Sequence, residues 1–341
     1  MSDRNRGRRG LTPTAVIASL AFVVASAAGL FPARAVRADV SPVEKEAYRL
    51  AMVESSKPAQ AMVSTRLLAL VPGDDPVNVV LLKGGAIRWS ADGTKVLVGS
   101  VLARSDWESY YAPCLGKETC RLQKSLWVSV VPELKTRFVP WERWGDGWVR
   151  TGVSECPPTQ RRVIQLLGLN PAKAYDLLVE MWVDPKDLFR PSGDPETRDH
   201  TGEPATQDAS GKWFFPADRS TFTKLDDTVM FKEAAWSTPG TGVPYRQWFA
   251  ANAASTYGTS DPDMAKWGSP WTQLGYTYDW NPEASRFGLS EFILRIDPCK
   301  GAPDPAKPCD GGGLLEIKVE QGVDLSSDPE RRKYFSCDPT W

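Results

Sequence analysis

Histidine is nearly absent from this sequence. His200 is the only one among 341 residues, which excludes zinc and copper sites built from several histidines. A Ser-His-Asp or Cys-His mechanism would have to use His200, and no Gly-x-Ser-x-Gly sequence accompanies it. The cysteines also lack Cys-x-x-Cys spacing. We therefore expect no metal site and no cofactor, and an exposed loop position for His200.

The chain also lacks an excess of basic residues and a long hydrophobic run. It has 41 basic and 42 acidic residues in all. Beyond residue 38 it has 35 basic and 41 acidic residues, a balance that disfavours binding to nucleic acid through charge. The apolar run over residues 15–31 is short and rich in Ala and Ser, unlike a membrane span. We expect no nucleic-acid partner and no membrane anchor in the mature chain.

The N-terminus has the pattern of a secretory signal peptide. Four arginines between residues 4 and 9 precede the apolar run, and small residues follow it up to Ala38. This pattern predicts a signal peptide over residues 1–38 and a single globular domain over residues 39–341, located in the periplasm or secreted. The pair Arg8-Arg9 loosely resembles a twin-arginine signal, so the choice between the Sec and Tat export routes stays open.

All six cysteines lie beyond residue 38, and an even number of cysteines in an exported protein indicates disulfides. Six cysteines allow fifteen pairings. Proximity in the sequence favours Cys114–Cys120 and Cys299–Cys309, each of which closes a loop with Pro or Gly inside it. The remaining pair is then Cys156–Cys337.

Hydrophobic patterning predicts several strands with a few separate helices. Ser41-Pro42-Val43-Glu44 has the residues of a helix start with a capping box. Leu177, Val179, Met181 and Val183 share one face of an expected strand. Residues 141–148 are expected to form a loop, and a polar loop or insertion is expected over about residues 191–212. Without regular β-α alternation, this mixture predicts an α+β fold with a mainly antiparallel sheet, a few packing helices and long disulfide-stapled loops. Further helices are expected over residues 159–167, 245–255 and 328–334, and further strands over residues 87–89, 95–101, 126–131, 274–280, 292–296 and 315–319.

Carboxylates are the remaining candidates for acid-base chemistry. Glu180 and Glu291 lie in or beside expected strands, and a pair of carboxylates is what glycoside hydrolysis requires. Glu180 lies opposite the apolar face of its strand, so a solvent-facing position is expected for it. The acidic residues Asp194, Glu196 and Asp199 do not follow the calcium pattern of an EF-hand.

Tryptophan is abundant, with 14 in the chain. Alternation along the expected strand at residues 274–280 places Tyr276, Tyr278 and Trp280 on one face. Such a face could stack sugar rings, and it is then a candidate ligand-binding surface. The same face could equally form the inner wall of the core.

Three segments carry a resemblance to a family. Residues 178–191, from Leu-Val-Glu-Met-Trp to Phe-Arg-Pro, and residues 274–280 together with 288–292 resemble signatures of an uncharacterised family of exported bacterial proteins. The resemblance covers the latter half of the chain. It implies a bacterial envelope protein, and it implies no activity and no functional residues.

Export, abundant Trp and Tyr, and the lack of a recognisable catalytic set favour non-catalytic binding of a cell-envelope ligand such as a glycan. Two alternatives stay open. One is a carboxylate-based glycan hydrolase that uses Glu180 and Glu291. The other is an envelope assembly or interaction protein. The sequence does not decide whether the protein is an enzyme.

Overall fold

The computed structural model describes residues 39–118, 120–121, 126–138, 141–144, 147–150, 156–215, 237–238, 243–294, 314–315 and 317–335. The expected signal peptide lies outside these ranges, as do Cys299, Cys309 and Cys337. None of the helices in the described ranges is long and apolar enough to cross a membrane.

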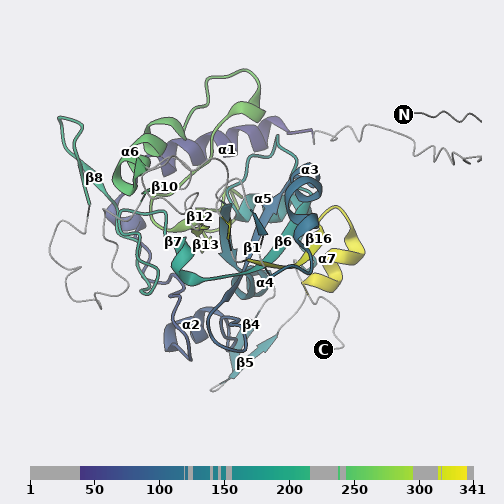
Figure 1. The fold of residues 1–341 in the computed structure, drawn as a ribbon. Helices are drawn as coiled ribbons and strands as arrows, with labels where there is room; N and C mark the ends of the chain where they lie inside the picture. The colour runs from purple at the N-terminus through teal and green to yellow at the C-terminus, as the bar shows by residue number, and fades with distance from the viewer. Residues whose placement is uncertain are drawn as a thin grey trace, which may run out of the picture. The chain divides into compact units, whose positions relative to one another are not determined.

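The fold is α+β and is organised on a mainly antiparallel six-stranded sheet, as the sequence predicts. The strand order is β16-β6-β1-β3-β14-β7. The four inner strands and two edge strands have the following bounds: β16 Lys318–Asp324, β6 Leu177–Val183, β1 Val96–Leu102, β3 Leu126–Val130, β14 Phe292–Leu294 and β7 Leu188–Phe189. Strands β1, β6 and β16 run side by side (Figure 1). The alternation of apolar residues predicted β6 with its correct bounds.

Short strands within the described ranges form five further pairs. Their bounds are β2 Cys120–Arg121 with β15 Leu314–Leu315, β4 Trp141–Trp144 with β5 Gly147–Arg150, β8 Thr206–Gln207 with β9 Trp213–Phe214, β10 Ser237–Thr238 with β11 Val243–Pro244, and β12 Tyr276–Tyr278 with β13 Phe287–Ser290. The prediction of a loop over residues 141–148 was wrong, because β4 and β5 form an antiparallel hairpin there. Both strands contain tryptophan, which favours β-strands. The Gly and charged residues in the same stretch had led to the prediction of a loop.

Seven α-helices lie in the described ranges. Their bounds are α1 Pro42–Ser55, α2 Pro76–Leu81, α3 Arg104–Asp106, α4 Val131–Arg137, α5 Gln160–Leu166, α6 Tyr245–Ser255 and α7 Asp328–Tyr334. The predicted start of α1 is confirmed: the Ser41 side chain accepts from the Glu44 backbone N–H, and the Glu44 carboxylate accepts from the Ser41 N–H. Two orphan donors of the first turn are thereby satisfied.

The two faces of the sheet are covered by different parts of the chain. The face that carries Val96, Val98, Val179 and Met181 packs on Leu68, Leu82 and Tyr111, among others. The opposite face carries Leu178 and packs on residues of α4, α5 and α7. Helix α7 lies beside β16 (Figure 1). Because both faces are covered, a polar residue that points away from the apolar face of β6 is still buried.

Candidate functional site

The aromatic residues predicted as a ligand platform lie in the core. Tyr276, Tyr278 and Trp280 are 2%, 5% and 3% exposed. Their polar tips bind within the protein. The Tyr276 hydroxyl donates to the Met62 carbonyl, the Tyr278 hydroxyl to the Glu54 carboxylate, and the Trp280 indole N–H to the Leu169 carbonyl. The strand covers only residues 276–278, and Tyr276 packs in a different cluster from Tyr278 and Trp280. The three rings therefore offer no common exposed stacking surface.

Glu180 is completely buried rather than solvent-facing, which corrects the expectation drawn from the alternation of β6. Its carboxylate accepts hydrogen bonds from the Tyr334 hydroxyl at 2.7 Å and from the Gln321 side-chain amide at 2.7 Å. The Lys135 ammonium lies 3.6 Å away. These partners come from α7, β16 and α4, the elements that cover this face. A carboxylate held by three partners is a structural group, because a buried charge persists only when it is paired.

We expect Tyr334→Phe to destabilise the fold by about 1–3 kcal/mol, because the buried Glu180 carboxylate would lose a hydrogen bond that nothing else replaces. Urea unfolding of the oxidised protein would measure this change. Tyr110→Phe is the matched control, since the hydroxyl of the partly buried Tyr110 makes no hydrogen bond to another described residue. Equal stability of Tyr334→Phe and Tyr110→Phe would contradict the assignment of the Glu180 network.

Glu180 and Glu291 do not meet in one site. Glu180 is on β6, and Glu291 directly precedes β14. Strands β1 and β3 lie between them, so three strand spacings of ~4.8 Å, or about 14 Å, separate the two backbones. The Glu180 carboxylate is moreover bound to Tyr334 and Gln321, and Glu180 does not line the cleft that Glu291 lines. The carboxylates of known glycosidase pairs are about 5–9.5 Å apart.

Glu291 lines a cleft of about 320 Å³. One wall is formed by residues of β1 and β3, including Ser100, Trp127 and Ser129. The facing wall is formed by the segment that follows α6, including Thr256 and Trp271. Trp127 is 39% exposed, and its ring meets that of Trp271 edge to face at 6.3 Å. The cleft therefore combines an accessible indole with several hydroxyl groups.

The Glu291 carboxyl is the most unusual group of this cleft. The residue is only 9% exposed, and its Oε2 atom has no hydrogen-bond partner among the residues that the structure describes. Burial raises the pKa of Glu291 to about 8, so the side chain is mainly neutral at pH 7. The nitrogen of the Asn252 side-chain amide, from a residue that also lines the cleft, likewise has no partner in the described part of the chain. A neutral carboxyl and an amide can each donate to and accept from a polar ligand.

No second Asp or Glu lines this cleft in the described part of the chain. Sequence reasoning identified Glu291 as a candidate, but it missed Trp127, Ser129 and Asn252 as its neighbours. Their positions in the sequence carry no common period, because strand pairing and the packing of the 256–271 segment bring them together. Tyr278 also contributes to this cleft, whereas Tyr276 lines a second cleft.

His200 has a structural position rather than the exposed one that we expected. Its Nδ1 lies 2.7 Å from the Leu67 carbonyl oxygen, and its Nε2 lies 3.1 Å from the Asp75 carboxylate. The Leu67 N–H donates to the His200 carbonyl. These contacts hold the polar segment of residues 191–212 against the part of the chain that precedes α2. The segment is accordingly packed at its start, where Pro191–Pro195 are buried, and ends in the β8–β9 hairpin.

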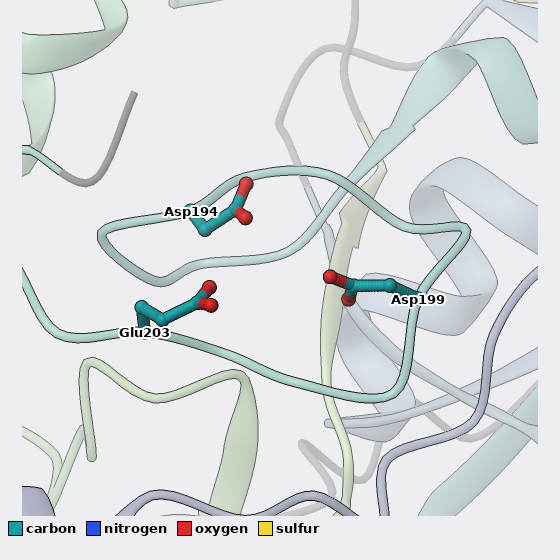
Figure 2. A group of neighbouring side chains, drawn as sticks. All are labelled: Asp194, Asp199 and Glu203. Carbon is teal, nitrogen blue, oxygen red and sulfur yellow. The ribbon is translucent and has the colours of Figure 1, made fainter. Parts of the chain in front are cut away.

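One group of carboxylates in the described ranges has a geometry suitable for a cation. Asp194, Asp199 and Glu203 place carboxylate oxygens within 4.8 Å of one another, and Figure 2 shows them facing a common space. Burial and the charges of Glu203 and Asp199 raise the pKa of Asp194 to about 8. The buried Arg190 guanidinium is close enough to be stabilised by Asp199, Glu196 and Asp194. The carboxylates of this cluster thus already have a compensating cation, the Arg190 guanidinium.

Two disulfides involve described cysteines. Cys114 and Cys120 are bonded to each other. Cys156 is also disulfide-bonded, and its sulfur lies 3.8 Å from the Phe335 carbonyl oxygen. Cys337, its predicted partner, and the predicted pair Cys299–Cys309 lie outside the described residues. The position of Cys156 beside residue 335 supports the pairing with Cys337, which stays a prediction.

Comparison with protein-family models, with curated proteins and with solved structures finds no match for this chain. The predicted resemblance to a family of exported bacterial proteins is therefore untested.

Proposed function

We propose that the protein is an exported, non-catalytic binding protein that holds a cell-envelope ligand, a glycan in particular, in the Glu291 cleft. The observation that carries this proposal is the buried Glu291 Oε2 atom, which has no partner within the described ranges and lines the same cleft as the exposed ring of Trp127. Buried polar atoms are nearly always hydrogen-bonded, so an orphaned one in a cleft indicates a partner from outside the chain.

A sugar has the chemistry that this cleft would bind. Its apolar ring face can stack on Trp127, and its hydroxyls can donate to or accept from Glu291, Asn252 and Ser129. The cleft volume of about 320 Å³ is at the lower end of known ligand pockets, which are ~300–1,000 Å³. It therefore suits one sugar unit of a longer chain better than an enclosed oligosaccharide. The N-terminal signal pattern supports an envelope ligand.

Glycan hydrolysis is the second candidate, because the raised pKa of Glu291 suits a general acid. The described lining of the cleft holds no second carboxylate to act as base or nucleophile, which favours binding without turnover. An assembly role is the third candidate, and its partner would be an envelope protein.

The first experiment incubates the oxidised protein with a panel of envelope glycans, followed by mass spectrometry and isothermal titration calorimetry. We expect binding without new products. Trp127→Ala should weaken binding at least tenfold, because it removes the stacking surface, and Glu291→Gln should weaken it less, because the amide keeps one donor and one acceptor. Phe214→Ala is the control: Phe214 is also 39% exposed, but it lies on β9 outside the cleft.

Cleaved glycans that disappear with Glu291→Gln would replace the binding proposal with hydrolysis. A protein that binds no member of the panel, or whose Trp127→Ala variant binds as well as wild type, would contradict a glycan site in this cleft. The assembly role would then be the remaining candidate.

A further inference from the structure

The register of the sheet determines which side chains form the floor of the Glu291 cleft. Ile293 on β14 pairs with Trp127 on β3, and side chains two residues apart lie on the same face of a strand. Glu291 and Ser129, each two residues from a member of this pair, therefore lie next to each other on the face that carries Trp127. A carboxyl, a hydroxyl and an exposed indole are thus neighbours on the floor of the cleft.

Three hydroxyls of the lining already donate within the protein. The Ser100 hydroxyl donates to the Trp127 carbonyl at 2.9 Å. The Thr277 hydroxyl donates to the Leu166 carbonyl at 2.7 Å, and the Tyr278 hydroxyl donates to a carboxylate of α1. A hydroxyl has one hydrogen to donate. These three groups therefore have none left for a ligand, and donors to a ligand must come from other side chains of the cleft.

Two buried atoms of the cleft have no hydrogen-bond partner among the described residues, and both belong to groups that donate near neutral pH. The Asn252 Nδ2 atom belongs to an amide NH₂ group, which donates. The Glu291 Oε2 atom belongs to a carboxyl whose pKa is raised by burial to about 8, so this carboxyl mainly keeps its O–H hydrogen at pH 7. Glu291 directly precedes β14 and Asn252 is on α6, so the two donors come from different elements.

An uncharged group with a carbonyl oxygen fits these two donors. The carbonyl oxygen of an amide has two lone pairs, so it can accept from the Glu291 O–H and from the Asn252 N–H together. An ammonium group has no acceptor to offer Asn252, and pairing with it would require Glu291 to lose its proton. The donors of the cleft therefore favour a ligand with an amide over a ligand with an amine.

Apolar side chains of the lining fit the remainder of an acetamido group. Val101, Leu126 and Leu167 are partly buried and line the cleft. They offer apolar surface to a methyl group, and the exposed indole of Trp127 offers a face on which a sugar ring can stack. A hydroxyl in place of the acetamido group has neither the methyl group nor the carbonyl oxygen, so it would leave this apolar surface in water.

We propose that the Glu291 cleft recognises the acetamido group of an N-acetylated amino sugar. The acetamido oxygen accepts from Glu291 and Asn252, the methyl group packs on the apolar lining, and the sugar ring stacks on Trp127. This inference rests on the function proposed above, and it names the class of glycan that the cleft selects.

The test uses three trisaccharides that share one β-1,4-linked backbone and differ only at carbon 2 of each sugar. Triacetylchitotriose has an acetamido group there, cellotriose a hydroxyl and chitotriose an amine. Isothermal titration calorimetry at pH 7 measures their binding to the oxidised protein. We expect triacetylchitotriose to bind about tenfold more tightly than the other two, or better, because only its carbonyl oxygen satisfies both buried donors.

The other outcomes distinguish this inference from the function on which it rests. Equal binding of triacetylchitotriose and cellotriose, weakened in both cases by Trp127→Ala, would leave the glycan site in place and overturn the acetamido assignment. Tightest binding of chitotriose would overturn that assignment in favour of an amine. No binding of any of the three trisaccharides would contradict both the glycan site and the acetamido assignment.

The pH dependence of binding reports on the protonation of Glu291. Affinity for triacetylchitotriose should fall at least about fivefold between pH 7 and pH 9.5, because Glu291 loses the hydrogen that it donates once the pH exceeds its pKa of about 8. The other titratable side chains of the described lining are Tyr175 and Tyr278, and burial raises the pKa of each to about 12. Burial and the charge of Glu291 also raise the pKa of Tyr257. These tyrosines stay neutral over this range, and a constant affinity would contradict the proposal.

Variants at the two donors connect the binding to the cleft. Glu291→Gln keeps an N–H donor, so it should bind triacetylchitotriose within about threefold of wild type and lose the pH dependence. Glu291→Leu removes the donor, and Asn252→Asp replaces a donor with an acceptor of similar shape. Each should weaken binding about tenfold or more. Glu283→Gln, at an exposed position outside the cleft, should bind as wild type does. Wild-type affinity in either Glu291→Leu or Asn252→Asp would overturn the proposal.

Discussion

Glu291→Gln should make the protein progressively more stable than wild type as the pH rises from 5 to 9. The pKa of Glu291 is about 8 in the folded protein because of burial, and its ordinary value is 4.5. Between these values the folded state holds a proton that the unfolded state has lost, so the free energy of unfolding of the wild type falls as the pH rises. Glutamine is neutral throughout and removes this dependence.

The expected difference between variant and wild type is within ~1 kcal/mol at pH 5 and on the order of 3–5 kcal/mol at pH 9. Urea unfolding at the two pH values, with the disulfides intact, would measure it. Asp194 and Glu133 also have raised pKa values, but they are present in both proteins and cancel in the difference. Glu283→Gln, at an exposed position, should follow the wild type at both values. A constant difference between Glu291→Gln and wild type would show that the Glu291 carboxyl is ionised and has a partner.

Arg190→Met should destabilise the fold by about 3–5 kcal/mol, the range measured when one member of a buried charged group is removed. Arg190 is fully buried. Its Nε donates to the Glu196 carbonyl, and its Nη2 donates to the Leu68 and Asp199 carbonyls at 3.0, 3.2 and 2.9 Å respectively. Methionine retains much of the stem but none of these donors, and it leaves the neighbouring carboxylates without their cation.

The loss should be concentrated in the polar segment that Arg190 organises. Limited proteolysis should cut the variant between residues 191 and 205 under conditions that leave the wild type whole. Arg198→Met is the control, because Arg198 lies in the same segment with an exposed side chain, and its unfolding free energy should stay within ~0.5 kcal/mol of wild type. Similar effects of the two substitutions would contradict the organising role of Arg190.

Local patterns predicted much of the fold. The capping residues before Glu44 predicted α1, and period-two alternation predicted β6. The same alternation placed Glu180 on the correct face of its strand but in the wrong environment. Whether a face of a strand is exposed to solvent depends on which elements pack on it. Here α4 and α7 pack on the face of Glu180, and they lie about 45 and 150 residues away from it in the sequence.

Less of the candidate site than of the fold could be predicted from the sequence. Glu291 is recognisable only as one acidic residue beside a strand. Its unpartnered carboxyl depends on Trp127 from β3 and on residues between α6 and β12. The aromatic alternation at residues 274–280 was a misleading signal, because a core built from large rings has the same pattern as a stacking surface until burial distinguishes them.

The order of strands in the sheet has a consequence for how the protein is made. Strand β1 pairs with β6, about 80 residues later, and the next partners β14 and β16 come from the last 50 residues of the chain. Few contacts of the sheet join residues that are close in the sequence. The entropic cost of closing long loops must therefore be met before the strands pair, and we expect folding to be slow. A ribosome-bound chain cannot complete the sheet before residue 324 has emerged. The late synthesis of β14 and β16 would therefore leave the nascent chain without a completed sheet for most of its synthesis.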